Sequence, residues 1–263
     1  MCGISGYISF RDDLPLEDYY ARHLLLRHRG RDDEGFFTLC ERGAALHRGD
    51  DTIPELHDLS HIRDQPSARV VLGHRRLAIL DLSAHGHQPM SRENGRYVMI
   101  YNGEIYNYVE LRSELISLGH SFESTSDTEV LLAAYAQWGI DCFSRLNGMW
   151  AVAIYDGEED TLVLSRDRFG IKPLYYATVD ATLYFASEVK FLLPYLPAVR
   201  MNEHRVKEYL VECLVDHHEQ TLFEGVHQVL PATWMRVRKG GIERYTYWRV
   251  PRDRRAGGVS GTG

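Results

Sequence analysis

Short runs of branched and aromatic residues recur along the chain, separated by polar stretches that contain glycine. Such runs favour β-strands, because their side chains pack well on a pleated sheet. We predict six strands, at residues 4–10, 70–72, 97–101, 149–155, 161–165 and 182–186. Glycine-containing polar turns at 156–160 and 238–241 separate adjacent strand-forming runs, which is typical of hairpins. Neighbouring strands are therefore expected to be antiparallel.

Four segments repeat apolar residues at helical spacing. The clearest begins with Ser126 and Glu129, the two ends of a capping box, and ends before Gly139. The other candidates are residues 15–27, 107–118 and 202–214. Together with the strands, these helices predict an α+β architecture.

Two segments lack such a pattern. Residues 40–69 are polar, contain glycine and proline and have no sustained period, so we predict a long loop with freedom to move. The glycine-rich end at 252–263 is predicted to be disordered. The chain contains no internal repeat, and no domain-sized linker precedes this end.

Composition excludes several classes of protein. Hydrophobic residues make up 44% of the 263 residues and charged residues 25%, as in ordinary globular proteins. No apolar run approaches the roughly 20 residues that span a bilayer, and the N-terminus lacks a secretory signal. We therefore expect a cytoplasmic protein without a membrane anchor. The net charge of -7 disfavours a nucleic-acid binder, whose phosphate contacts need clustered lysine and arginine.

The cysteines and histidines do not form the patterns of disulfide frameworks or metal sites. The four cysteines are scattered along the chain, at Cys2, Cys40, Cys142 and Cys213. Reduced thiols are therefore expected. The closest histidine pairs, at 85 and 87 and at 217 and 218, lack the spacing and the acidic or thiolate neighbours of a recognised metal site. No metal is expected.

Cys2 follows the initiator Met1 directly, so removal of one residue would make this cysteine the N-terminus. A thiol is strongly nucleophilic but mostly protonated at neutral pH, and it needs a base within hydrogen-bond reach. A free α-amino group, with a pKa of about 7.7 to 8.0, supplies that base. Position alone leaves two interpretations open: a catalytic nucleophile, or one of the many near-terminal cysteines that have no role.

Further motifs follow this terminus in one order. They are Met-Cys-Gly-Ile-Ser-Gly at 1–6, Arg-His-Arg-Gly at 27–30, Gly-His-Arg-Arg-Leu at 73–77, Gly-His-Gln-Pro-Met at 86–90, Tyr-Asn-Gly-Glu-Ile-Tyr-Asn at 101–107, Ser-Asp-Thr-Glu at 126–129, Arg-Asp-Arg-Phe-Gly-Ile-Lys-Pro-Leu-Tyr at 166–175 and Ala-Ser-Glu-Val-Lys at 186–190. Each motif alone is weak evidence. Together, over roughly residues 1–248, they make the chain resemble the glutaminase domain of asparagine synthetase.

The resemblance implies a class II glutamine amidotransferase domain with the N-terminal-nucleophile hydrolase fold. That fold is a four-layer αββα sandwich of two antiparallel sheets. The implied domain covers residues 1–250, with a catalytic core at about 1–195 and a helix and hairpin at 196–250 that lead towards a synthetase domain absent from this chain. Residues 251–263 form the predicted disordered tail.

The same resemblance assigns candidate site residues. Cys2 is the nucleophile, and the Asn102 side-chain amide and the Gly103 N–H would stabilise the oxyanion that forms when a thiolate attacks an amide. The substrate-binding residues that it implies are Arg76, Leu77, Ile79, Glu104 and Asp127. An arginine can grip the α-carboxylate of glutamine with two hydrogen bonds, and acidic residues can receive its ammonium group.

Simpler interpretations of these residues stand beside the functional ones. The Asn-Gly dipeptide alone is typical of a turn between strands. Asp127 alone is typical of a first-turn acid that the helix dipole keeps ionised. Arg75, the neighbour of the implied carboxylate-binding arginine, is expected at the surface. Arg166 and Asp167 are expected to order a loop that supports the site without touching the substrate.

Three departures from the family pattern matter. Arg31 stands where proline is usual, which removes no chemical group. Residues 40–69 look longer than the family connection and could cover the glutamine cleft. No glycine-rich phosphate loop follows a strand and precedes a helix, so this chain is not expected to bind ATP. ATP and Mg are expected only for the absent synthetase domain, and no cofactor is expected in this chain.

The preferred interpretation is an enzyme that hydrolyses L-glutamine to glutamate and ammonia through a Cys2 glutamyl thioester. It would supply ammonia to an amide-forming reaction of the asparagine synthetase type. The alternative is a catalytically silent docking or structural module of a synthetase. The expected partners are L-glutamine and a synthetase domain or subunit that accepts the ammonia, whereas a homodimer and the identity of the acceptor are left open.

Overall fold

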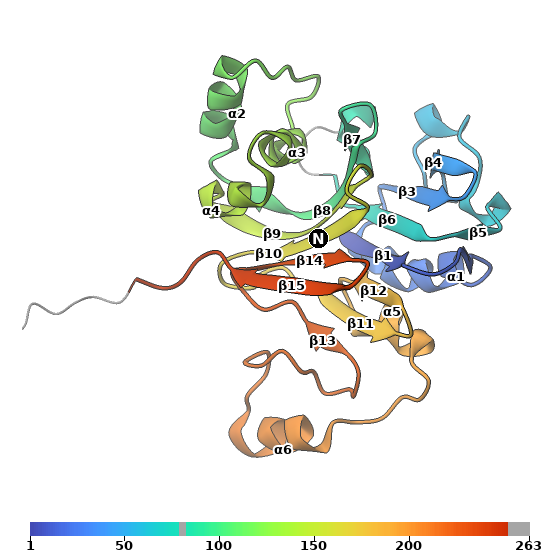
Figure 1. Cartoon of the computed structure of the whole chain (residues 1–263), viewed down its shortest axis with the longest axis vertical. Coiled ribbons are helices and arrows are strands. Elements are labelled where there is room, and N and C mark those ends of the chain that lie inside the picture. Colours follow the sequence, from blue (N-terminus) through green and yellow to red (C-terminus); the bar gives the residue numbers. More distant parts are fainter. Residues whose placement is uncertain (79–82, 252–263) are drawn as a thin grey trace, which may run out of the picture.

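The computed structural model describes residues 1–78 and 83–251 (Figure 1). Most strands belong to two antiparallel sheets. The first sheet contains β1 (Gly3–Ser9), β3 (Asp33–Cys40), β4 (Gly43–His47), β6 (Val70–Arg76), β11 (Tyr175–Val179), β12 (Thr182–Ala186) and β13 (His227–Gln228). Its strand order is β13-β11-β12-β1-β6-β3-β4, so β1 is a central strand. β2 (Leu14–Pro15) and β5 (Ser67–Ala68) pair separately.

The second sheet has six strands in the described chain. They are β7 (Met90–Arg92), β8 (Tyr97–Ile105), β9 (Gly148–Asp156), β10 (Thr161–Arg166), β14 (Thr233–Arg238) and β15 (Gly241–Thr246). Their order is β15-β14-β10-β9-β8-β7. The helices are α1 (Tyr19–His23), α2 (Tyr108–Ser117), α3 (Asp127–Trp138), α4 (Cys142–Arg145), α5 (Val189–Leu192) and α6 (Glu203–Glu212).

The two sheets pack face to face between two layers of helices. Figure 1 places α2, α3 and α4 over the sheet of β8 and β9, with α1 and α5 on the far side of the sheet that contains β1. Three buried clusters fill the spaces between these four layers. The arrangement confirms the predicted αββα sandwich. Within the described residues, no helix is both long enough and apolar enough to cross a membrane.

Side-chain alternation along β8 explains how one strand serves two cores. Tyr97, Met99 and Tyr101 pack in the cluster that includes α2 and α3. Val98 and Ile100 point to the other face and pack against the first sheet. Because successive side chains of a strand point to opposite faces, a strand covered on both sides carries apolar residues at every position. That continuous run is the pattern that predicted the strand.

The six predicted strands are confirmed, and β6, β8, β9 and β10 extend beyond the predicted bounds. Both predicted hairpins are confirmed by antiparallel pairing, of β9 with β10 and of β14 with β15. β8 continues through Asn102 and Gly103 and pairs with β9 there, so the interpretation of this dipeptide as a turn is wrong. The sequence analysis missed several strands, including β3 and β11.

The predicted helix at 126–139 is confirmed as α3. Ser126 caps it by accepting a hydrogen bond from the Glu129 N–H, and Gly139 follows its end with a φ of 57°. α2 and α6 confirm the predictions at 107–118 and 202–214. The candidate at 15–27 is wrong in its bounds: α1 spans only five residues and continues as a tighter 3-10 helix over Leu24–Arg29.

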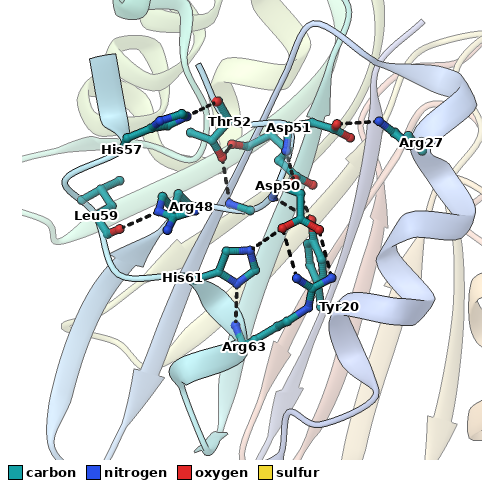
Figure 2. Close-up of polar contacts among 12 residues, drawn as sticks. Tyr20, Arg27, Arg48, Asp50, Asp51, Thr52, His57, Leu59, His61 and Arg63 are labelled. Atoms are coloured by element: carbon teal, nitrogen blue, oxygen red, sulfur yellow. Dashed lines mark hydrogen bonds and ion pairs between the residues drawn. The ribbon is translucent and has the colours of Figure 1, made fainter. Parts of the chain in front are cut away.

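The prediction of a long mobile loop at 40–69 was wrong. The segment contains β4, β5 and two 3-10 turns, and its polar side chains bond to one another and to the neighbouring helix. Asp50 accepts hydrogen bonds from both Arg63 and His61, and Asp51 pairs with Arg27 at 2.6 Å (Figure 2). A polar sequence without a regular period therefore corresponds here to a surface segment that hydrogen bonds and ion pairs hold in place.

Arg75 is not at the surface, as the sequence analysis expected, but fully buried. Its guanidinium pairs with Glu34, which is also fully buried, and with Asp51 at 2.6 Å. The strand position explains the error, because Arg75 and Arg76 are neighbours on β6 and point to opposite faces of a sheet that is covered on both sides. The segment 40–69 supplies part of that cover.

Replacement of Arg75 by methionine is expected to lower the free energy of unfolding by about 3–5 kcal/mol, because Glu34 is left as a buried charge without its cation. Urea denaturation measures the change. The matched control is Arg63→Met, which breaks an exposed pair with Asp50 and should cost about 1 kcal/mol or less. The double variant E34Q/R75M should recover part of the loss. Equal effects of R75M and R63M would contradict the buried-pair explanation.

Candidate active site

A cavity of about 120 Å³ lies where β1, β6, β8 and α3 meet. Its lining includes seven of the eight candidate residues, namely Cys2, Arg76, Leu77, Asn102, Gly103, Glu104 and Asp127. The eighth, Ile79, lies outside the described residues. Met1 and Lys172 also line the cavity. The fold thus gathers residues from distant parts of the sequence around one cysteine.

Strand pairing fixes the position of Cys2. In the β1–β6 pair Gly3 lies opposite Arg75, so Cys2, just before β1, lies beside Arg76 and Leu77. The Leu77 N–H donates to the Cys2 Sγ at 3.4 Å. Burial raises the pKa of the Cys2 thiol above its usual value, while this N–H and the nearby positive charges act in the opposite direction.

Arg29 anchors the residue that carries the thiol. Its Nε donates to the Cys2 carbonyl at 3.0 Å, and its Nη1 pairs with Glu188 at 2.9 Å. Glu188 also pairs with His28 and Lys190. The Arg-His-Arg-Gly and Ala-Ser-Glu-Val-Lys motifs, far apart in sequence, therefore meet at the terminus. The sequence analysis quoted both motifs but did not assign them this contact.

The Asn102 side chain is almost fully buried, and its Nδ2 has no hydrogen-bond partner among the described residues. Buried polar groups are nearly always paired, because an unpaired donor keeps the cost of leaving water. An amide N–H of this kind, beside a cavity that also contains a thiol, is a donor that a bound molecule can use.

The Gly103 N–H lies on the same edge of β8 as two backbone N–H groups with known partners. The Tyr101 N–H donates to Gln88 at 2.6 Å, and the Ile105 N–H donates to Asp127 at 2.9 Å. Because backbone groups alternate in direction along a strand, the Gly103 N–H points away from β9, as these two do. It is thus directed to the side on which the cavity lies.

Close packing against the adjacent strand explains why position 103 is a glycine. A Cβ there would lie 2.3 Å from the Met149 carbonyl oxygen and 2.9 Å from the Trp150 Cα. These are backbone atoms of the adjacent strand, which cannot move aside as a flexible side chain can. Close approach of β9 therefore requires the missing side chain at this position.

Asp127 is the buried acid of the site. Its Oδ2 accepts hydrogen bonds from the Tyr101 hydroxyl and the Ile105 N–H, both at 2.9 Å. Burial raises the pKa of this carboxyl, although its hydrogen bonds and the first N–H groups of α3 act to lower it. The N–H groups at the start of α3 thus act in the direction that the sequence analysis expected of the helix dipole, while burial opposes them. Glu104, in contrast, is exposed.

Arg76 is the buried cation that the resemblance placed in the site. Its side chain is 5% exposed, its Nη1 donates to the Ser83 carbonyl at 3.1 Å, and the same atom lies 4.0 Å from Asp33. The cavity lining thus combines the Cys2 thiol and the Arg76 guanidinium with two carboxyl groups, those of Glu104 and Asp127. This is the set of charges that a free amino acid requires.

Arg166 and Asp167 order a loop, as the sequence analysis predicted, but they do so separately and not as an ion pair with each other. Asp167 accepts hydrogen bonds from the N–H groups of Phe169, Ile171 and Lys172. Arg166 donates to the Gly170 and Lys172 carbonyls at 2.8 Å. The loop brings Lys172 to the cavity, a residue that the sequence analysis did not single out.

The segment 40–69 does not line the cavity in the described part of the chain. It contacts the site indirectly, because Asp51 pairs with Arg75 and that residue precedes Arg76. The hypothesis that this segment covers the cleft therefore finds no support in the geometry.

Comparison with known proteins agrees with this architecture. The family of glutamine amidotransferase domains matches residues 42–248. Asparagine synthetase [glutamine-hydrolyzing] 3 of Bacillus subtilis is 33% identical over 97% of this chain and 38% of its own length. Asparagine synthetase [glutamine-hydrolyzing] 1 of the same organism is 39% identical over 78% of this chain and 31% of its own length.

A search of solved structures gives the same fold. The glutamine phosphoribosylpyrophosphate amidotransferase of B. subtilis matches with a TM-score of 0.68 and 21% identity, over 94% of this chain and 49% of that one. The sandwich of two antiparallel sheets therefore has the N-terminal-nucleophile hydrolase fold. The chain belongs to the glutamine amidotransferase domain family and is of the asparagine synthetase type. It spans about a third of the length of the curated relatives that it matches.

Replacement of Arg29 by methionine is expected to lower glutamine hydrolysis at saturating substrate by about ten- to a hundredfold, because a misplaced nucleophile loses its reactive geometry. Steady-state kinetics measures the change. The matched control is Arg27→Met on the same 3-10 helix, whose partner Asp51 lies outside the cavity lining. If both variants lose activity equally, anchoring of Cys2 by Arg29 is not the cause.

Proposed function

We propose that this chain, after removal of Met1, hydrolyses L-glutamine to glutamate and ammonia through a Cys2 glutamyl thioester. The observation that carries the proposal is the buried, unpaired Asn102 Nδ2 at the cavity that also contains Cys2, Arg76 and Asp127. A nucleophile, an oxyanion donor and two opposite charges for a free amino acid meet there.

The substrate would be held at both of its charged groups. Arg76 would bind the α-carboxylate, since a guanidinium can form two parallel hydrogen bonds with it. Asp127 and Glu104 would receive the ammonium group, and Leu77 would contact the substrate beside Cys2. This pairing of charges selects free glutamine over a glutamine side chain in a protein, which lacks both charged groups.

The chemistry would then proceed in two steps. The Cys2 α-amine accepts the thiol proton, and the thiolate attacks the side-chain amide carbon to form a tetrahedral oxyanion. Asn102 Nδ2 and the Gly103 N–H donate to that oxygen. The α-ammonium returns the proton to the leaving nitrogen, the C–N bond breaks, and ammonia departs. Water then attacks the thioester, which releases glutamate and restores the thiol.

We further propose that the ammonia supplies an amide-forming reaction. The matched relatives are glutamine-hydrolysing asparagine synthetases, and this chain corresponds to about a third of their length. A synthetase domain or subunit would activate an acceptor carboxylate, and ATP and Mg would belong to that unit.

The direct test is release of glutamate and ammonia from L-glutamine by protein whose Met1 removal is verified by intact mass. Activity is expected for the processed chain and for the control Cys40→Ala, and it should be abolished in Cys2→Ala. The second variant removes the nucleophile, whereas Cys40 does not line the cavity. No hydrolysis by fully processed protein, even with an ammonia-accepting synthetase added, would favour a silent docking module.

Replacement of Asn102 by alanine is expected to lower kcat by about a hundred- to a thousandfold, because one oxyanion donor is lost. KM should change little, since the donor acts on charge that develops only in the transition state. Steady-state kinetics of processed N102A separates the two constants. A large rise in KM with an unchanged kcat would instead assign Asn102 to substrate binding.

A further inference from the structure

A second buried cation lines the cavity beside Cys2. Lys172 is 7% exposed, and its side chain reaches the same cavity as Cys2, Asn102 and Asp127. The proposed chemistry needs one cation for the substrate carboxylate, and Arg76 already fills that role. The proposed mechanism therefore gives the positive charge of Lys172 no role.

The backbone of Lys172 is fixed on both sides. Its N–H donates to the Asp167 carboxylate at 2.9 Å, and its carbonyl accepts from the Arg166 Nε at 2.8 Å. Both supporting side chains are buried: Asp167 is completely buried and Arg166 is 4% exposed. The loop that follows β10 thus holds the base of the lysine side chain in one place.

The ammonium group, in contrast, is unpaired. Within residues 1–78 and 83–251, no hydrogen bond or ion pair engages the Lys172 Nζ, and both of its hydrogen bonds belong to the backbone. The Nζ is not among the fully buried polar atoms that lack a partner, so it is open to the cavity that Lys172 lines and can pair with a negative charge that forms there. The cavity contains few candidates for that opposite charge.

The charged and titratable groups that line the cavity come from every element around it. They are Arg76 of β6, Tyr101 and Glu104 of β8, Asp127 of α3, Lys172, Cys2 and the N-terminal amine. Asp127 already has two donors, and Glu104 is exposed to water. Among the described residues the Cys2 Sγ has hydrogen bonds only with backbone groups of Leu77, and the charges that act on it are those of the N-terminal amine, Arg76 and Lys172.

We propose that Lys172 stabilises the thiolate form of Cys2 as its fixed counter-charge. Burial raises the pKa of the thiol, and the Leu77 N–H and the positive charges of the N-terminal amine, Arg76 and Lys172 act against that rise. In the proposed chemistry Arg76 binds the substrate carboxylate, which leaves Lys172 as the other side-chain cation of the cavity. The same charge would lower the proton affinity of the Cys2 α-amine after Met1 removal, which keeps more of this base unprotonated at neutral pH. Lys172 is thus a positioning residue that acts through Cys2. The inference rests on the proposed function only in taking Cys2 as the nucleophile.

Alkylation of Cys2 by iodoacetamide tests the proposal without any substrate, because only the thiolate reacts. Processed protein is labelled over a series of pH values, and the modified N-terminal peptide is quantified by mass. In Lys172→Met the midpoint of the rate profile is expected to rise by about one pH unit, which slows labelling at neutral pH about tenfold. Lys172→Arg, which keeps the charge, should stay near the parent.

The matched control is Lys239→Met, in the exposed turn between β14 and β15, whose profile should equal that of the parent. An unchanged midpoint in Lys172→Met together with a raised KM for glutamine would overturn the proposal and assign Lys172 to the substrate carboxylate. Equal pH profiles of Cys2 labelling in Lys172→Met and Lys172→Arg would overturn it too, because the packing of the side chain and not its charge would then determine the reactivity of the thiol. If Lys172→Met fails to fold by thermal melting, Lys172→Gln takes its place.

This experiment also separates the inference from the proposed function. A chain that does not hydrolyse glutamine still has a measurable Cys2 labelling profile, so loss of glutaminase activity leaves the result interpretable. Conversely, an active enzyme with an unshifted profile in Lys172→Met would retain its function and lose only the counter-charge.

Discussion

The pairing of β1 on both edges is the constraint on which the site depends. β12 and β6 bond to opposite sides of this strand, so the chain is held in the middle of a sheet from Gly3 onward, directly after Cys2. Chain termini are usually mobile, and a mobile terminus could not hold a nucleophile in place. A slip of β1 by one residue would turn every side chain to the other face and carry Cys2 away from Arg76.

Around this fixed terminus, the second sheet contributes the other half of the site. β8 extends past the end of its partner β7, which leaves backbone N–H groups on that edge without a neighbouring strand. Gln88 and Asp127 bind two of these groups, and the Gly103 N–H lies between them. The part of β8 beyond β7 thereby presents a row of backbone N–H donors, and the protein's own side chains accept hydrogen bonds from two of them.

Much of this arrangement could be predicted from the sequence, for identifiable reasons. Continuous apolar runs predicted the strands because the sheets are covered on both faces, and the Ser126 cap predicted α3 because capping is local chemistry. The family resemblance that rests on the motifs named seven residues that line the cavity of the structure. β3 was missed because its first residues, Asp33 and Glu34, are charged yet buried, and only tertiary partners make that tolerable.

The wrong prediction for Arg75 and the failure to single out Lys172 have the same origin. A charged side chain is expected in water unless something pairs with it. Arg75 pairs with Glu34 of β3 and with Asp51 of the segment that was predicted to be a loop. Lys172 lies in the motif at 166–175, from which the sequence analysis considered only Arg166 and Asp167, and the cavity lining connects it with Cys2. Sequence periodicity carries no information about such contacts between distant segments.

The place of Met1 in the cavity has a consequence for timing. Met1 lines the same cavity as Cys2, so under the proposed function a methionine lies where glutamine would enter. In the proposed mechanism its removal by an aminopeptidase opens the site and creates the base in one cut. The freshly synthesised protein would behave as a short-lived proenzyme, and the cell's methionine-removal machinery would decide when glutamine begins to be consumed.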